Sequence, residues 1–147
     1  MDEQYMREAL NLARMASGAD EVPVGAVIVL NGEIVARAAN SAISSHDPTA
    51  HAEINAIRQA AAALENYRLE DAELFCTLEP CPMCAGAIVH ARIRRLIFGA
   101  RDLRFGGVRS KFRIADSELL NHRVEIVEGV LGVECAELLQ TFFSRRR

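Results

Sequence analysis

The sequence of 147 residues contains no tryptophan, no repeat and no low-complexity segment. No apolar run reaches the roughly 18 residues that a membrane-spanning helix requires. Basic residues are not in excess either, since 17 Lys and Arg face 20 Asp and Glu for a net charge of −3. These absences argue against a membrane protein and against a protein that is basic overall, as many nucleic-acid binders are. Half of the residues are apolar, which excludes a disordered chain, and the length suits a single core, so we expect one globular domain over residues 1–147.

The chain has four cysteines, and their spacing is informative. The first residues lack the basic start and apolar stretch of a secretory signal, so we expect a cytoplasmic protein with reduced thiols. Of the four cysteines, Cys81 and Cys84 form the single C-x-x-C pair, which indicates metal or redox chemistry rather than a structural disulfide. Cys76 and Cys135 are interpreted as small buried side chains.

The periodicity of apolar residues predicts alternating helices and strands. Residues 4–16 have the three-and-four spacing of one helical face, and Asn31-Gly32 between two β-rich runs predicts a hairpin. Asp47 and Thr49 are candidate caps for a helix that begins near His51. The expected helices are residues 4–16, 50–65, 80–90, 114–120 and 133–143, and the expected strands are residues 22–30, 33–38, 74–78, 95–99 and 124–127.

The order of these elements predicts the fold class. Residues 74–99 read strand, helix, strand, which is the parallel crossover unit. Combined with the antiparallel hairpin, this unit requires a mixed sheet. We therefore expect a three-layer α/β/α fold in which helices cover both faces of a mixed, five-stranded central sheet.

Four residues carry the candidate chemistry. Cys81 and Cys84 lie three positions apart at an expected helix start, so one turn places both sulfurs on the same side, where the helix dipole favours thiolate. His51 also lies near a helix start, and Glu53 follows it by two positions. Two cysteines and a histidine suit Zn²⁺, and Glu53 is interpreted as a carboxylate that moves protons rather than a ligand.

The number of ligands separates a structural from a catalytic zinc site. A site with four cysteines would have to recruit Cys76 and Cys135 from apolar contexts, which we consider unfavourable. Three ligands and one open position are typical of catalytic zinc, which lowers the pKa of a bound water to about 7. A structural zinc site without catalysis remains the alternative, although Glu53 would have no role in such a site. The other histidines lie in loops or away from the expected metal face.

The pattern His51-Ala52-Glu53 followed by Pro80-Cys81-Pro82-Met83-Cys84 resembles the zinc-deaminase signature H-x-E…P-C-x-x-C. The longer strings around it, together with Phe98-Gly99-Ala100-Arg101-Asp102, resemble the bacterial tRNA-specific adenosine deaminases of the cytidine/deoxycytidylate deaminase superfamily. The similarity runs from the first expected helix to the last.

This resemblance implies hydrolytic deamination of the wobble adenosine (position 34) to inosine in the anticodon stem-loop of an arginine tRNA. It implies a homodimer with one zinc per subunit, held by His51, Cys81 and Cys84. It further implies that zinc-bound hydroxide attacks C6 of the base and that Glu53 moves the proton. The resemblance also implies that Asn40 contacts the flipped base.

The basic residues bear on whether the substrate is a polymer. Between residues 92 and 113, eight Arg and Lys face a single acid, Asp102, and three arginines end the chain. A planar guanidinium suits phosphate contacts and stacking on exposed bases, although a solvated surface is equally compatible with the charge alone. The residues expected to contact RNA are Arg101, Arg104, Phe143, Arg145, Arg146 and Arg147.

Two competing functions stay open at this point. A deaminase of free guanine, or of cytosine or a nucleoside, shares the zinc ligands and differs in the pocket and the basic tail. A non-catalytic RNA-binding subunit with a structural zinc is the other alternative, and the presence of Glu53 argues against it.

Overall fold

A computed structural model describes residues 1–146 as four helices and five strands connected by loops. In none of these four helices is an apolar stretch long enough to cross a membrane. In chain order the elements are α1 (Asp2–Gly18), β1 (Gly25–Leu30), β2 (Glu33–Ala39), α2 (Ala52–Leu64), β3 (Glu73–Leu78), α3 (Pro82–His90), β4 (Arg95–Ala100), β5 (Glu125–Glu128) and α4 (Gly132–Ser144).

The five strands form one mixed sheet in the order β2-β1-β3-β4-β5. Strand β1 is antiparallel to both β2 and β3, whereas β3, β4 and β5 are parallel. Strands β2, β3, β4 and β5 therefore end at the same edge of the sheet, and β1 begins there. This common edge is where the loops that carry the candidate site converge.

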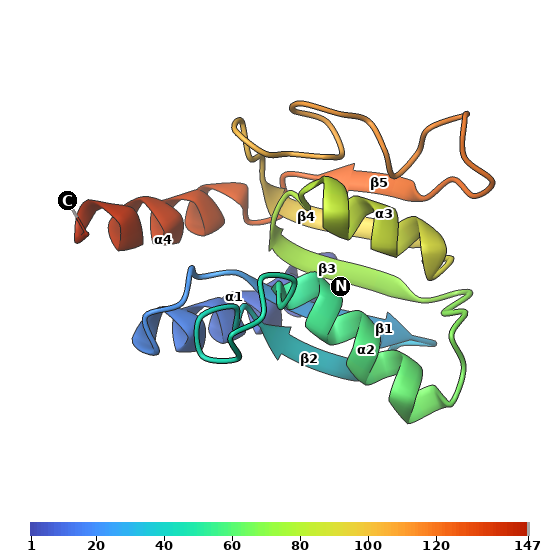
Figure 1. The fold of residues 1–147 in the computed structure, drawn as a ribbon, viewed down its shortest axis with the longest axis horizontal. Coiled ribbons are helices and arrows are strands. Elements are labelled where there is room, and N and C mark those ends of the chain that lie inside the picture. Colours follow the sequence, from blue (N-terminus) through green and yellow to red (C-terminus); the bar gives the residue numbers. More distant parts are fainter. Residues whose placement is uncertain (147) are drawn as a thin grey trace.

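Helices cover both faces of the sheet, which confirms the expected three-layer α/β/α architecture (Figure 1). Helices α2 and α3 pack on the face that carries Ile28, Leu74 and Phe98. Helices α1 and α4 pack on the opposite face, against Phe75 and Ile97. Because side chains alternate along a strand, neighbouring residues of β3 and β4 contribute to two separate cores.

The hairpin between β1 and β2 follows the sequence prediction. Asn31 and Gly32 both have positive φ, at 52° and 79°, as a two-residue type I′ turn requires. The twist of such a turn matches the twist of the two strands, so the hairpin closes without a longer loop.

Two local predictions were wrong. Residues 114–120 form turns rather than a helix, because Ile114 N–H donates to Gly107 and the Ala115 carbonyl accepts from Val124, which ties this segment to distant backbone. Neither Asp47 nor Thr49 caps α2: the Asp47 carboxylate accepts hydrogen bonds from the backbone and hydroxyl of Thr49, and the N-cap residue is His51. Tertiary and loop hydrogen bonds override the local preference in both places.

Substitution of Gly25 tests how closely α1 packs on the sheet. A Cβ at Gly25 would lie 2.0 Å from the Ala9 carbonyl oxygen and 2.8 Å from Ala13 N, both backbone atoms of α1. We expect Gly25→Ala to reduce the free energy of unfolding by about 1 to 3 kcal/mol, because the helix must move away from β1. Urea unfolding of the purified variant measures this loss.

The control is Gly86→Ala in α3, where an added Cβ meets nothing within 4 Å. This substitution should leave stability unchanged or raise it by up to about 1 kcal/mol, since alanine favours a helix interior. Equal unfolding midpoints for both variants would contradict the packing argument.

Candidate active site

A pocket of about 530 Å³ opens at the edge where the strands end. Its walls come from separate segments that the sheet topology gathers: residues just before β1, after β2, at the start of α2, between β3 and α3, and after β4. In open α/β sheets, ligands bind beyond the carboxyl ends of the strands. The lining residues are Val22, Val24, Asn40, Pro48, His51, Glu53, Leu78, Glu79, Cys81, Pro82, Met83, Asp102 and Phe105.

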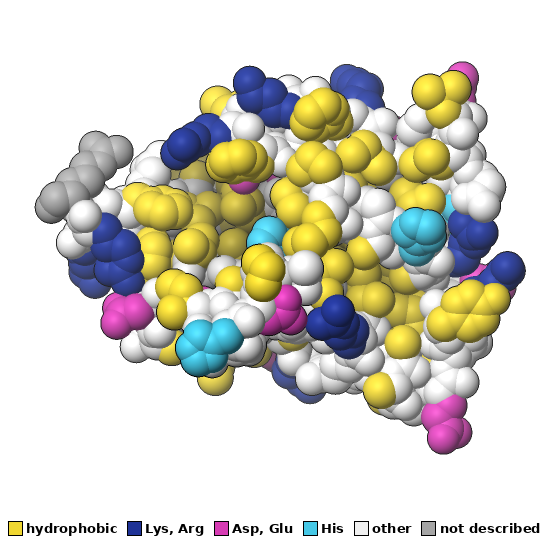
Figure 2. Space-filling model, viewed as in Figure 1, with side chains coloured by type: hydrophobic (Ala, Val, Ile, Leu, Met, Phe, Trp, Pro, Cys, Tyr) yellow, Lys and Arg dark blue, Asp and Glu magenta, His cyan; other side chains and the backbone are white. Residues whose placement is uncertain are grey.

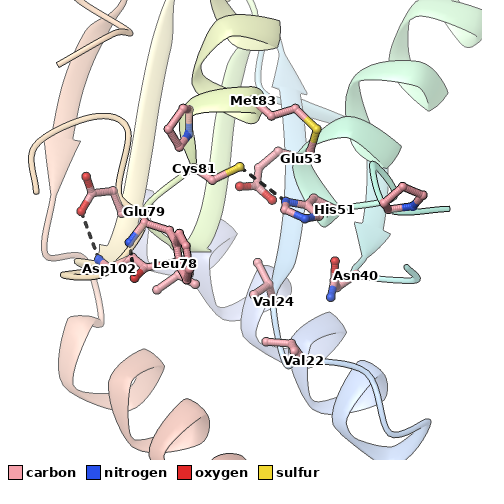
Figure 3. Close-up of a pocket in the computed structure, with 13 residues that line it drawn as sticks. Val22, Val24, Asn40, His51, Glu53, Leu78, Glu79, Cys81, Met83 and Asp102 are labelled. Carbon is pink, nitrogen blue, oxygen red and sulfur yellow. Dashed lines mark hydrogen bonds between the residues drawn. The ribbon is translucent and has the colours of Figure 1, made fainter. Parts of the chain in front are cut away.

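Two helix N-termini bring the three expected metal ligands together. His51 is the N-cap residue of α2, and Cys81 is the N-cap residue of α3. Pro82 occupies the first turn of α3, where its missing N–H leaves no donor unpaired, and the same turn carries Cys84. One ligand atom from each of His51, Cys81 and Cys84 lies within 4.8 Å of the others, and Figure 3 shows the labelled Cys81 and His51 facing each other.

The distances fit tetrahedral zinc. Nδ1 of His51 lies 3.6 Å from Cys81 Sγ and 3.5 Å from Cys84 Sγ. Tetrahedral bonds of about 2.0 to 2.1 Å to nitrogen and about 2.3 Å to sulfur separate the two ligand atoms by about 3.6 Å. The side chains are thus spaced for a shared ion, with Nδ1 as the coordinating nitrogen. Three protein ligands leave the fourth position for water or substrate.

The two thiols differ in acidity. Hydrogen bonds from Cys84 and His51 lower the pKa of Cys81 to about 4, despite burial. The pKa of Cys84 is raised, first because its thiol donates to Cys81 and then because it is buried. The pKa of His51 is raised by its hydrogen bond to Cys81. The pair therefore holds negative charge on sulfur at neutral pH, which a divalent cation favours.

Glu53 lies in the first turn of α2 and lines the same pocket. Only 4% of the residue is exposed, and burial raises its pKa to about 7. A carboxyl group with such a pKa both accepts and releases a proton near neutral pH, as general acid–base catalysis requires. Figure 3 shows this carboxylate next to His51 and Cys81.

Asn40 directly follows β2 and lines the pocket beside His51 (Figure 3). Its backbone N–H donates to the Val24 carbonyl at 3.1 Å, which fixes the position of the residue. Asn40 is half-buried, and among residues 1–146 its side-chain amide makes no hydrogen bond. The amide is therefore available to a ligand as both donor and acceptor.

Sequence reasoning missed much of the pocket wall. It did not single out Glu79, Met83, Asp102 or Phe105, all of which line the cavity. The available signal was the charged Glu79 between an apolar strand and Pro80, a place where a carboxylate needs a buried partner. The other three come from loop or helix positions whose direction depends on tertiary packing.

The basic residues do not form one surface. Arg92, Arg94 and Arg95 lie at the start of β4, so the full length of that strand separates them from the pocket edge. Arg95 is largely buried and pairs with Asp2 at 2.6 Å, and it also pairs with Glu73 and Glu125. The cluster formed by Arg95 and these three carboxylates joins α1 to three strands and therefore has a structural role.

Several expected RNA contacts also have partners within the chain. Arg101 pairs with Glu128 at 2.7 Å, and Arg146 pairs with Asp20 at 2.8 Å. The Arg146 guanidinium also lies 3.9 Å from the centroid of the Phe142 ring.

The remaining expected contacts are more accessible. Phe143 is 47% exposed, and Arg104 and Arg145 are exposed. Arg147 lies outside the described residues. Figure 2 shows hydrophobic side chains around a hollow on the viewed face and basic side chains toward its periphery.

The ligand geometry predicts about one zinc per chain. Cys84→Ser should lower the zinc content sharply, because one of three protein ligands loses its thiolate. Glu53→Ala should retain zinc, because all three ligands remain. Elemental analysis of gel-filtered protein measures both, and Cys135→Ala, a buried thiol outside the ligand group, is the control. Loss of zinc from Glu53→Ala would contradict the assignment of ligands.

Comparison with known proteins agrees with this geometry. Residues 1–100 match the cytidine and deoxycytidylate deaminase zinc-binding region. A tRNA-specific adenosine deaminase of Haemophilus influenzae is 50% identical over 147 residues, covering 99% of this chain and 85% of the relative. The tRNA-specific adenosine deaminase of Bacillus subtilis is 47% identical, covering 99% and 91% of the two chains.

Solved structures show the same fold. A structure from a study of A-to-I editing by tRNA:A34 deaminases has a TM-score of 0.90 at 47% identity, covering 92% of this chain and 99% of its own. A guanine deaminase from Nitrosomonas europaea has a TM-score of 0.84 at 26% identity, covering 97% and 84%. With its ligand geometry and these matches, the chain belongs to the zinc-binding cytidine and deoxycytidylate deaminase family.

Proposed function

We propose that this protein hydrolyses the wobble adenosine, position 34, of a tRNA to inosine, with an arginine tRNA as the expected substrate. One observation carries the proposal: the His51, Cys81 and Cys84 ligand group, the buried Glu53 carboxyl and the unpaired Asn40 amide meet at a single pocket. Relatives at 47% to 50% identity over nearly the whole chain are tRNA-specific adenosine deaminases, which supports the choice of substrate.

The proposed reaction divides among three groups of residues. His51, Cys81 and Cys84 hold zinc, which supplies Lewis-acid activation of water at neutral pH. Glu53 takes a proton from the attacking water and delivers it to N1 of the adenine ring. The water oxygen bonds to C6, the bond from C6 to the amino nitrogen breaks, and ammonia leaves after a second proton transfer.

Asn40 and the apolar wall position the base. The Asn40 amide supplies a donor and an acceptor for the edge of the ring, and Val24 and Leu78 belong to the apolar wall of the same pocket. A pocket of about 530 Å³ lies in the usual range for ligand sites, about 300 to 1,000 Å³. The target base must leave its stack to enter, so an anticodon loop, whose bases are unpaired, is a favourable substrate.

A deaminase of free guanine is the second candidate. It is favoured by the structural similarity to the guanine deaminase, at a TM-score of 0.84. That enzyme is 26% identical to this chain, whereas the tRNA-specific relatives reach 50%. The two candidates share the zinc chemistry and are expected to differ in the residues that line the pocket and in the basic tail.

We further propose that residues 1–147 form one deaminase domain and that two chains associate as a homodimer, with one zinc in each. Figure 2 shows apolar side chains gathered on the face that carries α2 and α3, where Leu64 and Met83 are 37% and 38% exposed. Burying such a face against a second copy would remove it from water. A tRNA substrate agrees with the cytoplasmic location expected from the sequence.

The decisive assay uses an anticodon stem-loop with adenosine at the wobble position. Zinc-loaded protein should convert this adenosine to inosine, and Glu53→Ala should abolish turnover while retaining zinc, because the proton shuttle is lost. Inosine is measured by nucleoside analysis of the digested RNA. Ammonia released from guanine or cytidine, with no inosine in the stem-loop, would overturn the tRNA assignment.

The salt dependence of stem-loop binding tests whether the basic tail, Arg145 to Arg147, contacts RNA phosphates. Replacing Arg145, Arg146 and Arg147 with alanine should weaken stem-loop binding and flatten the plot of log affinity against log salt, by about 0.7 for each phosphate that the protein no longer neutralises. The matched control replaces Arg92, Arg94 and Arg123, which cluster at the opposite end of the sheet. It removes the same charge and should leave the slope unchanged. Equal slopes for the tail variant and the unmodified protein would show that the tail is only solvated.

A further inference from the structure

Phe105 is an exposed aromatic residue at the rim of the pocket. Its exposed fraction is 61%, yet it lines the same cavity as His51 and Glu53. A single exposed apolar side chain is common on protein surfaces and by itself indicates nothing. The way in which Phe105 is held, and the charge beside it, distinguish it from the other exposed rings.

A buried carboxylate fixes the loop that carries Phe105. Glu79 is only 2% exposed, and it accepts hydrogen bonds from the backbone N–H of Asp102 at 3.1 Å and of Arg109 at 2.7 Å. Further hydrogen bonds come from Val108 N–H at 3.1 Å and from the backbone and hydroxyl of Ser110. These donors lie on both sides of Phe105 in the sequence, so one carboxylate links the two ends of the loop that carries this residue.

The same loop lies directly against the turn that carries the metal ligands. A Cβ at Gly106 would lie 2.3 Å from a Glu79 carboxylate oxygen, and a Cβ at Gly107 would lie 2.7 Å from Pro82 N. Gly107 N–H donates to the Pro80 carbonyl at 2.7 Å. The backbone next to Phe105 is therefore fixed relative to the metal ligands, and this backbone holds Phe105 at the rim of the pocket.

A positively charged side chain, Arg104, lies next to the Phe105 ring. The Arg104 guanidinium carbon lies 5.6 Å from the centroid of the Phe105 ring. Arg101 and Arg109 of the same loop pair with Glu128 and Asp116, whereas Arg104 forms no ion pair among residues 1–146. An aromatic ring beside an available cation is how proteins hold single-stranded nucleic acid, with a base on the ring and a phosphate near the charge.

We propose that Phe105 is the stacking surface for a base that flanks the target adenine. The proposal rests on the proposed RNA substrate: when the target base enters the pocket, its neighbour in the strand loses a stacking partner. Phe105 lies at the rim and offers the replacement. The residue thereby favours an RNA strand over a free base or nucleoside, which has no neighbour to stack.

Steady-state kinetics on the wobble-adenosine stem-loop tests this role. Phe105→Ala should raise KM by about 5- to 100-fold, the usual loss when one aromatic ring that stacks a base is removed, and leave kcat within about twofold. Phe105→Tyr should restore the original KM. Phe112→Ala is the matched control, because Phe112 is 57% exposed and does not line the pocket.

Abasic substrates separate stacking from a general loosening of the loop. Removing the base on one side of the target adenosine, 5′ or 3′, should raise KM for the unmodified protein by a similar factor. The same abasic substrate should cause no further loss with Phe105→Ala, because the partner ring is already absent. Additive losses with both abasic substrates would overturn the proposal, as would an unchanged KM for Phe105→Ala.

Equilibrium binding distinguishes this proposal from the proposed function. Fluorescence anisotropy of the labelled stem-loop with zinc-loaded protein should show about 5-fold or greater weakening for Phe105→Ala and none for Phe112→Ala. If the unmodified protein binds the stem-loop in this pattern without forming inosine, the proposed reaction fails and the stacking role stands. Equal binding by all three proteins, with inosine formed, overturns the stacking role alone.

Discussion

The approach of two helix N-termini at one edge of the sheet is the constraint on which the site depends. His51 at the start of α2 and Cys81 at the start of α3 meet because β2 and β3 end at the same edge. The antiparallel strand β1 between them sets the spacing of the two helices. With Cys84 one turn later, three ligand atoms lie within 4.8 Å, as a single zinc ion requires.

Burial then gives the residues around the ligands distinct chemical properties. Burial shields the Glu53 carboxyl group from solvent, so its pKa rises to about 7 and the group is suited to transferring protons. Glu79 is buried to a similar degree, but its carboxylate accepts hydrogen bonds from loop backbone and from Ser110. Burial raises the pKa of Glu79, and those hydrogen bonds outweigh it, so the net pKa is lowered. One carboxylate is poised for chemistry and the other remains charged and holds the loop.

The distribution of arginine separates structural from available charge. A run of basic residues in sequence is divided by β4, whose two ends lie at opposite edges of the sheet. Arg95 joins three acidic residues of separate elements, and Arg101 and Arg109 are paired beside the pocket. Arg104, next to an exposed ring, has no such partner among residues 1–146. Net charge therefore says less about an RNA surface than the pairing of each guanidinium does.

Local sequence patterns alone predict the amphipathic α1, the Asn31-Gly32 hairpin and the C-x-x-C turn, and the H-x-E pattern singles out His51 as a ligand. These depend on residue type and spacing over a few positions. Tertiary structure excludes a helix over residues 114–120, because Ile114 and Ala115 hydrogen bond to distant backbone. It also decided that Glu79 would hold the loop and that Phe105 would stand at the rim. Those features arise from contacts between segments far apart in the chain, which no local pattern encodes.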